Sequence, residues 1–290
     1  MSEPVRQTIP LRDGAVSALV WEGGGPLLHF AHANGFNAET YRGLLAPLSD
    51  RFRIVASDAR GQGRSELPAT PGMARRWTVF RDDLIDLLDR IAPGGAILAG
   101  HSMGATASLM AAVLRPDKVR ALILTEPVFI PASEKFRSWL VRLLPFLQRE
   151  VPLAERALKR RAEFPSMEMA LAAYRRRGAF RTWKEETILD YLRGGLVPSA
   201  GGFRLACSPE WESECFRLAP LGAARLAGRV RCPVTLVHAE NGTARRGEVA
   251  RFARLNPAAR IVACEGASHF LPMEYPALVR EEILRIASGS

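Results

Sequence analysis

The sequence predicts an α/β fold in which a mostly parallel central sheet is flanked by helices. Three observations carry this prediction. Short, continuously apolar runs of strand length recur along the chain, helical patterns separate them, and the alternation breaks only once, in one long segment. Strands that are buried on both faces read as continuous apolar runs, which is typical of a parallel sheet covered by helices.

The individual elements follow from these runs in order. A hairpin comes first, over Gln7–Leu11 and Ala15–Trp21, with Asp13-Gly14 as its turn. Buried strands are then expected at Leu27–Ala31, Arg53–Ser57, Ala96–Ala99, Ala121–Thr125, Val234–His238 and Arg260–Cys264. Helices are expected between them, at Glu39–Leu48, Trp77–Ile91, Gly104–Leu114, Gly247–Leu255 and Pro276–Ala287.

The single break in the alternation predicts an insertion. From residue 131 to residue 220 the chain carries helical periodicity and basic clusters but no convincing strand. We therefore expect a core made of residues 1–130 and 221–290, with residues 131–220 inserted as a helical cap between the fourth and fifth buried strands.

Composition places the chain among soluble globular proteins. It has 290 residues, of which 48% are apolar and 24% are charged. The longest apolar stretches are far below the ~20 residues of a membrane span, and the first residues are too charged for a signal peptide, so a cytoplasmic protein is expected. Four cysteines without a CxxC pair indicate reduced thiols.

The formal net charge of +10 is concentrated in the insertion. Between Arg156 and Lys184 nine basic residues stand against two acidic ones. No nucleic-acid motif or aromatic stacking platform accompanies them. We expect a solvated helix face that keeps the insertion soluble or draws anionic substrates, and neither a nucleic-acid nor a membrane partner.

The sharpest local signal is Gly100-His101-Ser102-Met103-Gly104, directly after one expected strand and directly before a helix. This is G-x-S-x-G in the strand-turn-helix context that gives it meaning, since small neighbours let the serine hydroxyl project above the sheet from a strained turn. We expect Ser102 to be a nucleophile. The Met103 backbone N–H, at the start of the helix, is expected to donate to a developing oxyanion.

A serine hydroxyl is a poor nucleophile unless a base takes its proton. Of the five histidines, only His269 follows the last expected strand in a loop, at the sheet edge where the elbow also opens. We expect His269 to be the general base. The other four are expected to be structural: His29, His32, His101 and His238.

Taken together, these features resemble an α/β-hydrolase-fold serine hydrolase with a helical cap. The resemblance covers essentially the whole chain and rests on the elbow at Ser102, the loops His32–Phe36 and Gly266–His269, and the glycine-rich turn Ser57–Ser65. It implies acyl transfer without a metal or an organic cofactor. A serine at the elbow argues against the epoxide hydrolases and haloalkane dehalogenases of this fold, which need a carboxylate nucleophile.

The resemblance also assigns the oxyanion hole. In the family, the loop after the third strand usually begins His-Gly, whereas here Ala33 stands where glycine is usual. The family pattern implies the Asn34 backbone N–H as the second donor, with Gly35 as the nearby alternative. It also implies that His32 pins this loop and that the turn at Asp58 is a glycine-rich connector.

The triad acid is where the sequence departs from the family. After the fifth buried strand, Gly242 stands about where most relatives have an aspartate. Two carboxylates can replace it, Glu240 in that segment and Glu126 at the end of the fourth strand, a position that some members of the fold use. We favour Glu126, because a charged residue that ends a buried strand beside Pro127 needs a reason, whereas Glu240 can face solvent. An elbow with no working acid remains the third alternative.

The expected function is hydrolysis of a small or medium apolar carboxylic ester or thioester through Ser102, His269 and Glu126. An apolar run after the fourth strand is expected either to line the pocket or to pack on the core: Phe129, Phe136, Trp139, Leu143, Leu144, Phe146 and Leu147. Two alternatives remain open. One is carbon–carbon bond hydrolysis or perhydrolysis on the same scaffold, and the other is a non-catalytic ligand-binding module.

Overall fold

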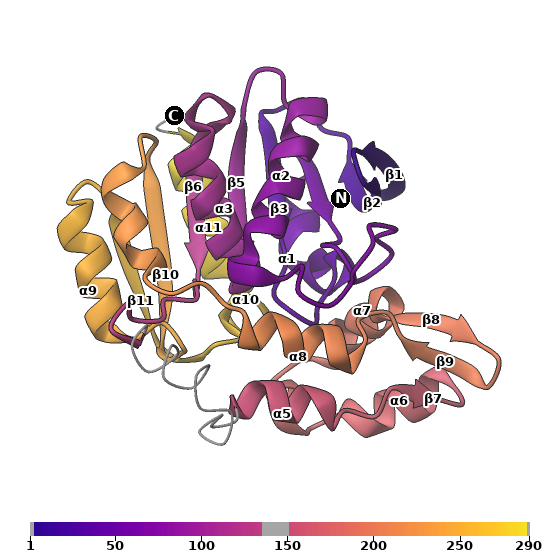
Figure 1. The fold of residues 1–290 in the computed structure, drawn as a ribbon. Coiled ribbons are helices and arrows are strands. Elements are labelled where there is room, and N and C mark those ends of the chain that lie inside the picture. The colour runs from indigo at the N-terminus through magenta and orange to yellow at the C-terminus, as the bar shows by residue number, and fades with distance from the viewer. Residues whose placement is uncertain (1–2, 135–150, 289–290) are drawn as a thin grey trace.

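An eight-stranded sheet forms the centre of the structure, a computed structural model that describes residues 3–134 and 151–288 (Figure 1). Its strands lie in the order β1-β2-β4-β3-β5-β6-β10-β11. The first two pair antiparallel and the six from β4 onward run parallel. Their bounds are β1 (Val5–Leu11), β2 (Gly14–Trp21), β3 (Leu27–Ala31), β4 (Arg53–Ser57), β5 (Ala96–His101), β6 (Val119–Thr125), β10 (Val234–Asn241) and β11 (Arg260–Ser268).

The structure confirms the predicted fold class, and each apolar run lies in a strand. At the amino ends β1, β2 and β6 begin one or two residues earlier than expected. At the carboxyl ends β5, β10 and β11 run two to four residues beyond the apolar residues. The carboxyl-end extensions are polar or small, so the apolar pattern alone did not include them. As a result, β5 ends directly before Ser102 and β11 ends directly before His269, at the carboxyl edge of the sheet.

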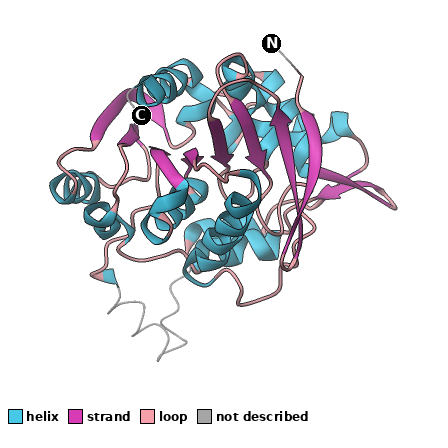
Figure 2. Cartoon of the chain, turned by 90° about the horizontal axis from the view of Figure 1, so that it is seen from above, coloured by secondary structure: helices cyan, strands magenta, loops and turns pink. Residues whose placement is uncertain are grey.

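Helices cover both faces of the sheet, as Figure 2 shows from above. On β5, Ile97 and Ala99 face the layer of α1 (Arg42–Leu45) and α11 (Pro276–Ser288), and Leu98 faces α2 (Thr78–Ile91), α3 (Met103–Leu114) and α9 (Arg246–Leu255). Side chains alternate across a strand, so a strand between two helical layers is apolar at most of its positions. Burying one such leucine contributes about 1.5–3 kcal/mol.

One expected helix is broken into shorter pieces. In place of a helix over residues 39–48 the chain forms 3-10 turns at Ala38–Tyr41 and Ala46–Leu48 on either side of the short α1. Pro47 cannot donate a backbone hydrogen bond, which shortens the helix before it. Further 3-10 turns lie at Arg75–Trp77, Pro116–Lys118, Gly178–Phe180 and Ala223–Arg229.

The insertion contains strands as well as helices, which corrects the expectation of a purely helical segment. Its elements are α5 (Pro152–Leu158), β7 (Glu163–Phe164), α6 (Met167–Tyr174), α7 (Glu185–Gly195), β8 (Leu196–Ser199), β9 (Gly202–Leu205) and α8 (Pro209–Arg217). The three strands form a small antiparallel sheet in the order β7-β9-β8. With two to four residues each, and with Pro198 in β8, they are too short to show an alternating pattern.

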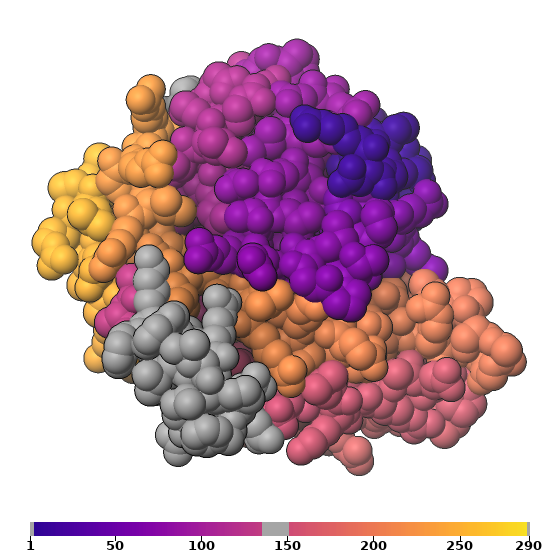
Figure 3. All heavy atoms as spheres, viewed as in Figure 1, coloured from indigo at the N-terminus to yellow at the C-terminus, as the bar shows by residue number. Residues whose placement is uncertain are grey.

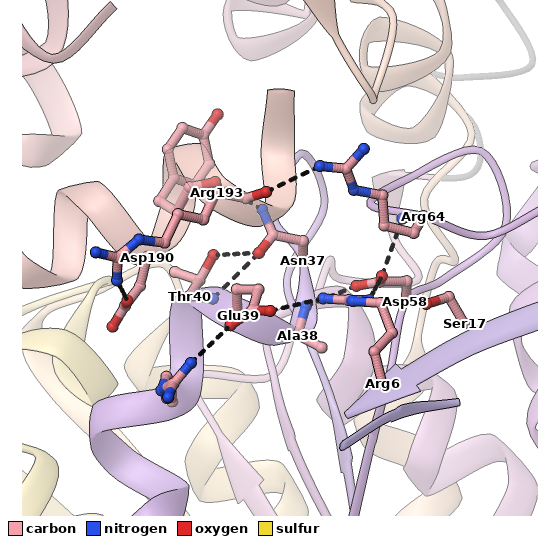
Figure 4. Close-up of polar contacts among 12 residues, drawn as sticks. Arg6, Ser17, Asn37, Ala38, Glu39, Thr40, Asp58, Arg64, Asp190 and Arg193 are labelled. Carbon is pink, nitrogen blue, oxygen red and sulfur yellow. Dashed lines mark hydrogen bonds and ion pairs between the residues drawn. The ribbon is translucent and has the colours of Figure 1, made fainter. Parts of the chain in front are cut away.

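The insertion lies beyond the carboxyl ends of the parallel strands, and its atoms pack directly against the core (Figures 1 and 3). Two core side chains donate to carbonyl groups in the last turns of α7. Asn37 Nδ2 lies 2.9 Å from the Tyr191 carbonyl oxygen. An Arg64 guanidinium nitrogen lies 3.1 Å from the Arg193 carbonyl oxygen (Figure 4). Helix carbonyls near a C-terminus lack intrahelical partners, so these bonds satisfy them and hold the insertion in place.

The nine basic residues between Arg156 and Lys184 face solvent, with one exception. Eight of them are exposed, and Arg160 instead turns inward to pair with the buried Glu212 of α8. The eight are therefore solvated. No helix within residues 3–134 and 151–288 is long and apolar enough to cross a membrane.

Only one residue of the apolar run expected after β6, Phe129, lies in the part of the chain that the structure describes. Phe129 is buried and stacks on Phe252 of α9 with ring centroids 5.5 Å apart, so it packs within the core. The other six lie outside the described residues: Phe136, Trp139, Leu143, Leu144, Phe146 and Leu147.

Candidate active site

Ser102 occupies a strained turn between β5 and α3. Its backbone has φ +54° and ψ −113°, a combination that L residues rarely adopt. The turn is fixed by the Ser102 N–H, which donates to the Thr125 carbonyl oxygen at 3.0 Å, and by the Ser102 carbonyl, which accepts from the Thr106 N–H at 3.1 Å. At Gly104 a Cβ would lie 2.2 Å from the Ala31 carbonyl oxygen, so only glycine lets β3 pass this close.

Three polar side chains form one hydrogen-bonded line at the carboxyl edge of the sheet. His269 follows β11, and its Nε2 lies 3.0 Å from Ser102 Oγ. On the other side of the ring, Nδ1 lies 3.0 Å from Oε2 of Glu126, which follows β6. The residues of these two pairs are 167 and 143 positions apart in the sequence, and the parallel strands bring them to one edge.

The Glu126 carboxylate is completely buried and fully hydrogen-bonded. Its Oε1 accepts from the Ala239 N–H at 2.7 Å, and its Oε2 accepts from the Thr243 N–H at 2.8 Å. Burial alone would raise the pKa of the Glu126 carboxyl, but hydrogen bonds from the His269 ring and these two N–H groups outweigh it and lower that pKa below its ordinary value. Glu126 is therefore ionised at neutral pH and is poised to orient the imidazole.

Gly242 explains why an acid from β6 can reach the histidine. A Cβ at residue 242 would lie 2.2 Å from Glu126 Oε2, so the carboxylate fills the space that a side chain there would need. Glu240, the other candidate acid, is exposed and accepts from the Gly266 N–H at 3.1 Å. Within the described residues, Glu240 makes no hydrogen bond to the His269 ring.

Thr243 is a residue that sequence reasoning missed. Its hydroxyl oxygen lies 2.8 Å from His269 Nδ1 and 3.5 Å from Glu126 Oε2, between the two side chains. Its backbone N–H already binds the same carboxylate. The only signal in the sequence was its place directly after Gly242, the residue that stands about where the family resemblance implies an aspartate.

The loop after β3 leaves one backbone N–H unused beside the elbow. The Ala33 N–H donates to the Tyr41 hydroxyl at 3.1 Å, and the Gly35 N–H donates to Gln62 Oε1 at 2.6 Å. In the part of the chain that the structure describes, the Asn34 N–H has no acceptor. Gly35 is thus already committed to Gln62, which disfavours it as the alternative donor.

The Met103 N–H, like the Asn34 N–H, has no hydrogen-bond acceptor in the described part of the chain. It is the first residue of α3, where a helix N–H has no intrahelical acceptor, and no acceptor among the described residues replaces it. A twelve-residue helix also presents the positive end of its dipole here. The Met103 and Asn34 N–H groups are therefore both available to an anionic oxygen.

Hydrogen bonds of His32 and Asp58 fix the loop after β3. The Ala59 N–H donates to His32 Nε2 at 2.8 Å, and His32 Nδ1 lies 2.7 Å from the Ala33 carbonyl oxygen, to which it donates. The buried Asp58 carboxylate accepts from the Ala38 N–H at 2.8 Å and from an Arg6 guanidinium nitrogen at 3.0 Å (Figure 4). The turn is thus a scaffold for the loop.

The insertion touches the same loop through α8. The Asn34 side chain donates from Nδ2 to the Glu212 carbonyl oxygen at 3.0 Å, and the Glu212 carboxylate lies against Gly35. Burial raises the pKa of the Glu212 carboxyl, although the partnered Arg160 guanidinium opposes this rise. The loop is therefore fixed from the core side and from the insertion side.

Comparison with known proteins adds to this geometry. Residues 30–282 match the model of the alpha/beta hydrolase family. The 2-(acetamidomethylene)succinate hydrolase of Mesorhizobium japonicum is 28% identical over 263 residues, which are 90% of this chain and 88% of that protein. A solved structure of E-2-(acetamidomethylene)succinate hydrolase superposes with a TM-score of 0.81 at 25% identity and covers 98% of this chain and 99% of that chain. An epoxide hydrolase of Caballeronia sordidicola is 36% identical over 118 residues, 39% of this chain and 34% of that protein.

A first prediction concerns the acid. Glu126→Gln should lower kcat for an aryl ester by about 10³ to 10⁴-fold, because a neutral amide cannot stabilise the imidazolium or fix its tautomer. Steady-state kinetics with matched melting temperatures would measure this effect. Glu240→Gln is the matched control and should remain near wild type. A larger loss in Glu240→Gln than in Glu126→Gln would contradict the assignment.

A second prediction concerns the space at residue 242. Gly242→Ala should push the Glu126 carboxylate away from His269 and lower kcat by about 10²-fold, the cost of a misplacement of roughly 1 Å. Gly247→Ala is the control, since a Cβ there meets nothing within 4 Å. Full activity in Gly242→Ala would show that the carboxylate does not depend on this space.

Proposed function

The chain belongs to the alpha/beta hydrolase family, and we propose that it is a serine hydrolase in which Ser102 is the nucleophile, His269 the general base and Glu126 the acid. One observation carries this proposal: the hydrogen-bonded line from the Ser102 hydroxyl through both ring nitrogens of His269 to a buried carboxylate. Such a line activates a hydroxyl that is otherwise a poor nucleophile.

In the acylation step, Ser102 Oγ attacks a substrate carbonyl while its proton moves to His269 Nε2. The imidazolium keeps its other proton on Nδ1, where Glu126 balances the positive charge. The tetrahedral oxyanion accepts hydrogen bonds from the Met103 and Asn34 backbone N–H groups. One such donor contributes about 10²- to 10³-fold to the rate. The proton on Nε2 then passes to the leaving group, and the acyl group remains on Ser102.

In the deacylation step, water attacks the acyl carbon. His269 Nε2 takes a proton from the water, and the same two N–H groups stabilise the second oxyanion. Collapse of this intermediate breaks the bond to Ser102 Oγ, which recovers its proton from His269. The products are a carboxylic acid and free enzyme.

We further propose that residues 131–220 act as a cap over a core made of residues 1–130 and 221–290. The hydrogen bonds that join α7 and α8 of this segment to the core loops support this division. Trp183 lies beside Phe36 and Phe270, with ring centroids 5.6 and 5.8 Å apart, and Phe270 contacts the His269 ring at 5.6 Å. An aromatic cluster next to the general base favours a substrate with an apolar group.

An ester or thioester is the substrate class that this mechanism serves most directly. A second candidate reaction is hydrolysis at an acetamido carbonyl, and it is supported by the relative that matches 90% of the chain. The name of its substrate describes an acetamido group joined through a methylene carbon to succinate, and an acetamido carbonyl can be attacked by the same serine. The epoxide hydrolase relative gives no third candidate, because Ser102 stands where that chemistry needs a carboxylate.

The decisive experiment for the proposal is covalent labelling. A fluorophosphonate probe should label wild-type protein at Ser102, since phosphonylation requires an activated hydroxyl. Ser102→Ala should not be labelled and should lose activity by at least about 10³-fold. Ser108→Ala, which removes a buried hydroxyl of α3, is the control and should be labelled like wild type. An unlabelled wild type would favour a non-catalytic ligand-binding module.

A substrate panel separates the candidate reactions. p-Nitrophenyl esters of increasing acyl length, 2-(acetamidomethylene)succinate and a vinylogous diketone would be compared by kcat/KM in wild type and Ser102→Ala. We expect the highest serine-dependent kcat/KM with an acyl substrate of the first or second kind. The highest value with the diketone would instead assign carbon–carbon bond hydrolysis.

A further inference from the structure

His101, directly before the nucleophile, binds the backbone of the general base. It is fully buried, and its Nε2 lies 2.8 Å from the His269 carbonyl oxygen. A carbonyl oxygen only accepts hydrogen bonds, so His101 Nε2 must carry the proton. Burial lowers the pKa of His101 well below its ordinary value, and the neighbouring His269 acts in the same direction. The ring is therefore neutral, and its Nδ1 is an acceptor.

Tyr41 continues the same chain of hydrogen bonds toward the loop after β3. Its hydroxyl lies 2.8 Å from His101 Nδ1 and must donate to it, because that nitrogen carries no proton. The Tyr41 oxygen in turn accepts the Ala33 N–H at 3.1 Å. Every direction is thus fixed: the Ala33 N–H to Tyr41, the Tyr41 O–H to His101 Nδ1, and the His101 Nε2–H to the His269 carbonyl.

This chain links two loops that the sheet does not link directly. Ala33 follows β3 and His269 follows β11, and the strands β5, β6 and β10 lie between these two in the sheet. The proposed reaction needs these two loops at fixed positions relative to each other, because the loop after β3 presents the Asn34 N–H and the loop after β11 presents the His269 imidazole. His101 at the end of β5 lies between them and contacts the His269 ring, with centroids 4.9 Å apart.

We propose that Tyr41 and His101 are positioning residues, a neutral strut that sets the oxyanion loop against the backbone of the general base. The inference rests on the proposed serine-hydrolase function and deepens it. Neither side chain belongs to the triad. They act by holding the Asn34 N–H and His269 Nε2 at fixed places around the atom that Ser102 attacks, which is the geometric requirement for transition-state stabilisation.

Tyr41→Phe is the first test. It keeps the ring that packs on Phe30 at 4.5 Å and removes both hydrogen bonds of the hydroxyl. We expect kcat for an aryl ester to fall at least about 10-fold with little change in KM, and fluorophosphonate labelling of Ser102 to slow with it. The low-field proton resonance of His269 Nδ1–H should shift, which lost packing elsewhere would not cause. Tyr275→Phe is the control, because this tyrosine is 41% exposed and its hydroxyl has no hydrogen bond in the described part of the chain.

A second pair of variants covers the case in which Tyr41→Phe does not fold. His101→Gln keeps one donor and one acceptor, whereas His101→Leu keeps neither, so Gln should retain at least about 10-fold more kcat than Leu at similar melting temperatures. Equal kcat in Gln and Leu, or wild-type kcat and an unshifted resonance in Tyr41→Phe, would overturn the strut while Ser102 labelling of the wild type upholds the proposed function. An unlabelled wild type would overturn the proposed function itself.

Discussion

The position of one buried carboxylate organises the whole site. Glu126 lies at the end of β6, but the groups that bind it come from β10 itself and from the segments that follow β10 and β11. A buried charge is costly unless it is fully hydrogen-bonded, so the Ala239 and Thr243 N–H groups and the His269 ring must all stay in place around it. The arrangement exists because residue 242 is glycine, and a Cβ there would occupy the space of the carboxylate oxygen. Three strand ends are thereby fixed by a single ionised group, and the imidazole is oriented toward Ser102 as a result.

The other side of the site is held by neutral hydrogen bonds. Around the loop after β3, Tyr41, Gln62 and Asp58 take up the backbone N–H groups of neighbouring residues, and the Asn34 N–H is left without an acceptor in the described part of the chain. A donor that is rigid and unpaired before the reaction needs no reorganisation when an oxyanion forms, which is the physical basis of electrostatic preorganisation. The insertion adds to the rigidity through Glu212, whose backbone carbonyl holds the side chain of the same asparagine.

Local signals were sufficient for the main elements of the fold and insufficient where the elements are short. Apolar runs located each buried strand of the central sheet, because a strand covered by helices on both faces is apolar at most of its positions. The sheet β7-β9-β8 in the insertion was missed, since strands of two to four residues have no measurable period and Pro198 argues against one of them. The helix expected over residues 39–48 was broken by a proline whose effect depends on its position within the turn.

The sequence by itself determined the fold class and singled out Ser102 and His269, because an elbow between a strand and a helix, and a histidine after the last strand, are signals contained within a few residues. It narrowed the acid to Glu126 or Glu240 and the second oxyanion donor to Asn34 or Gly35. Only the tertiary structure shows which carboxylate faces the imidazole and which N–H is already bonded. The carboxylate contact joins residues 143 positions apart and depends on the space left by a missing side chain. The Ala33 and Gly35 N–H groups are bonded by side chains 8 and 27 positions further along the chain. None of these contacts is encoded in a local pattern of residues.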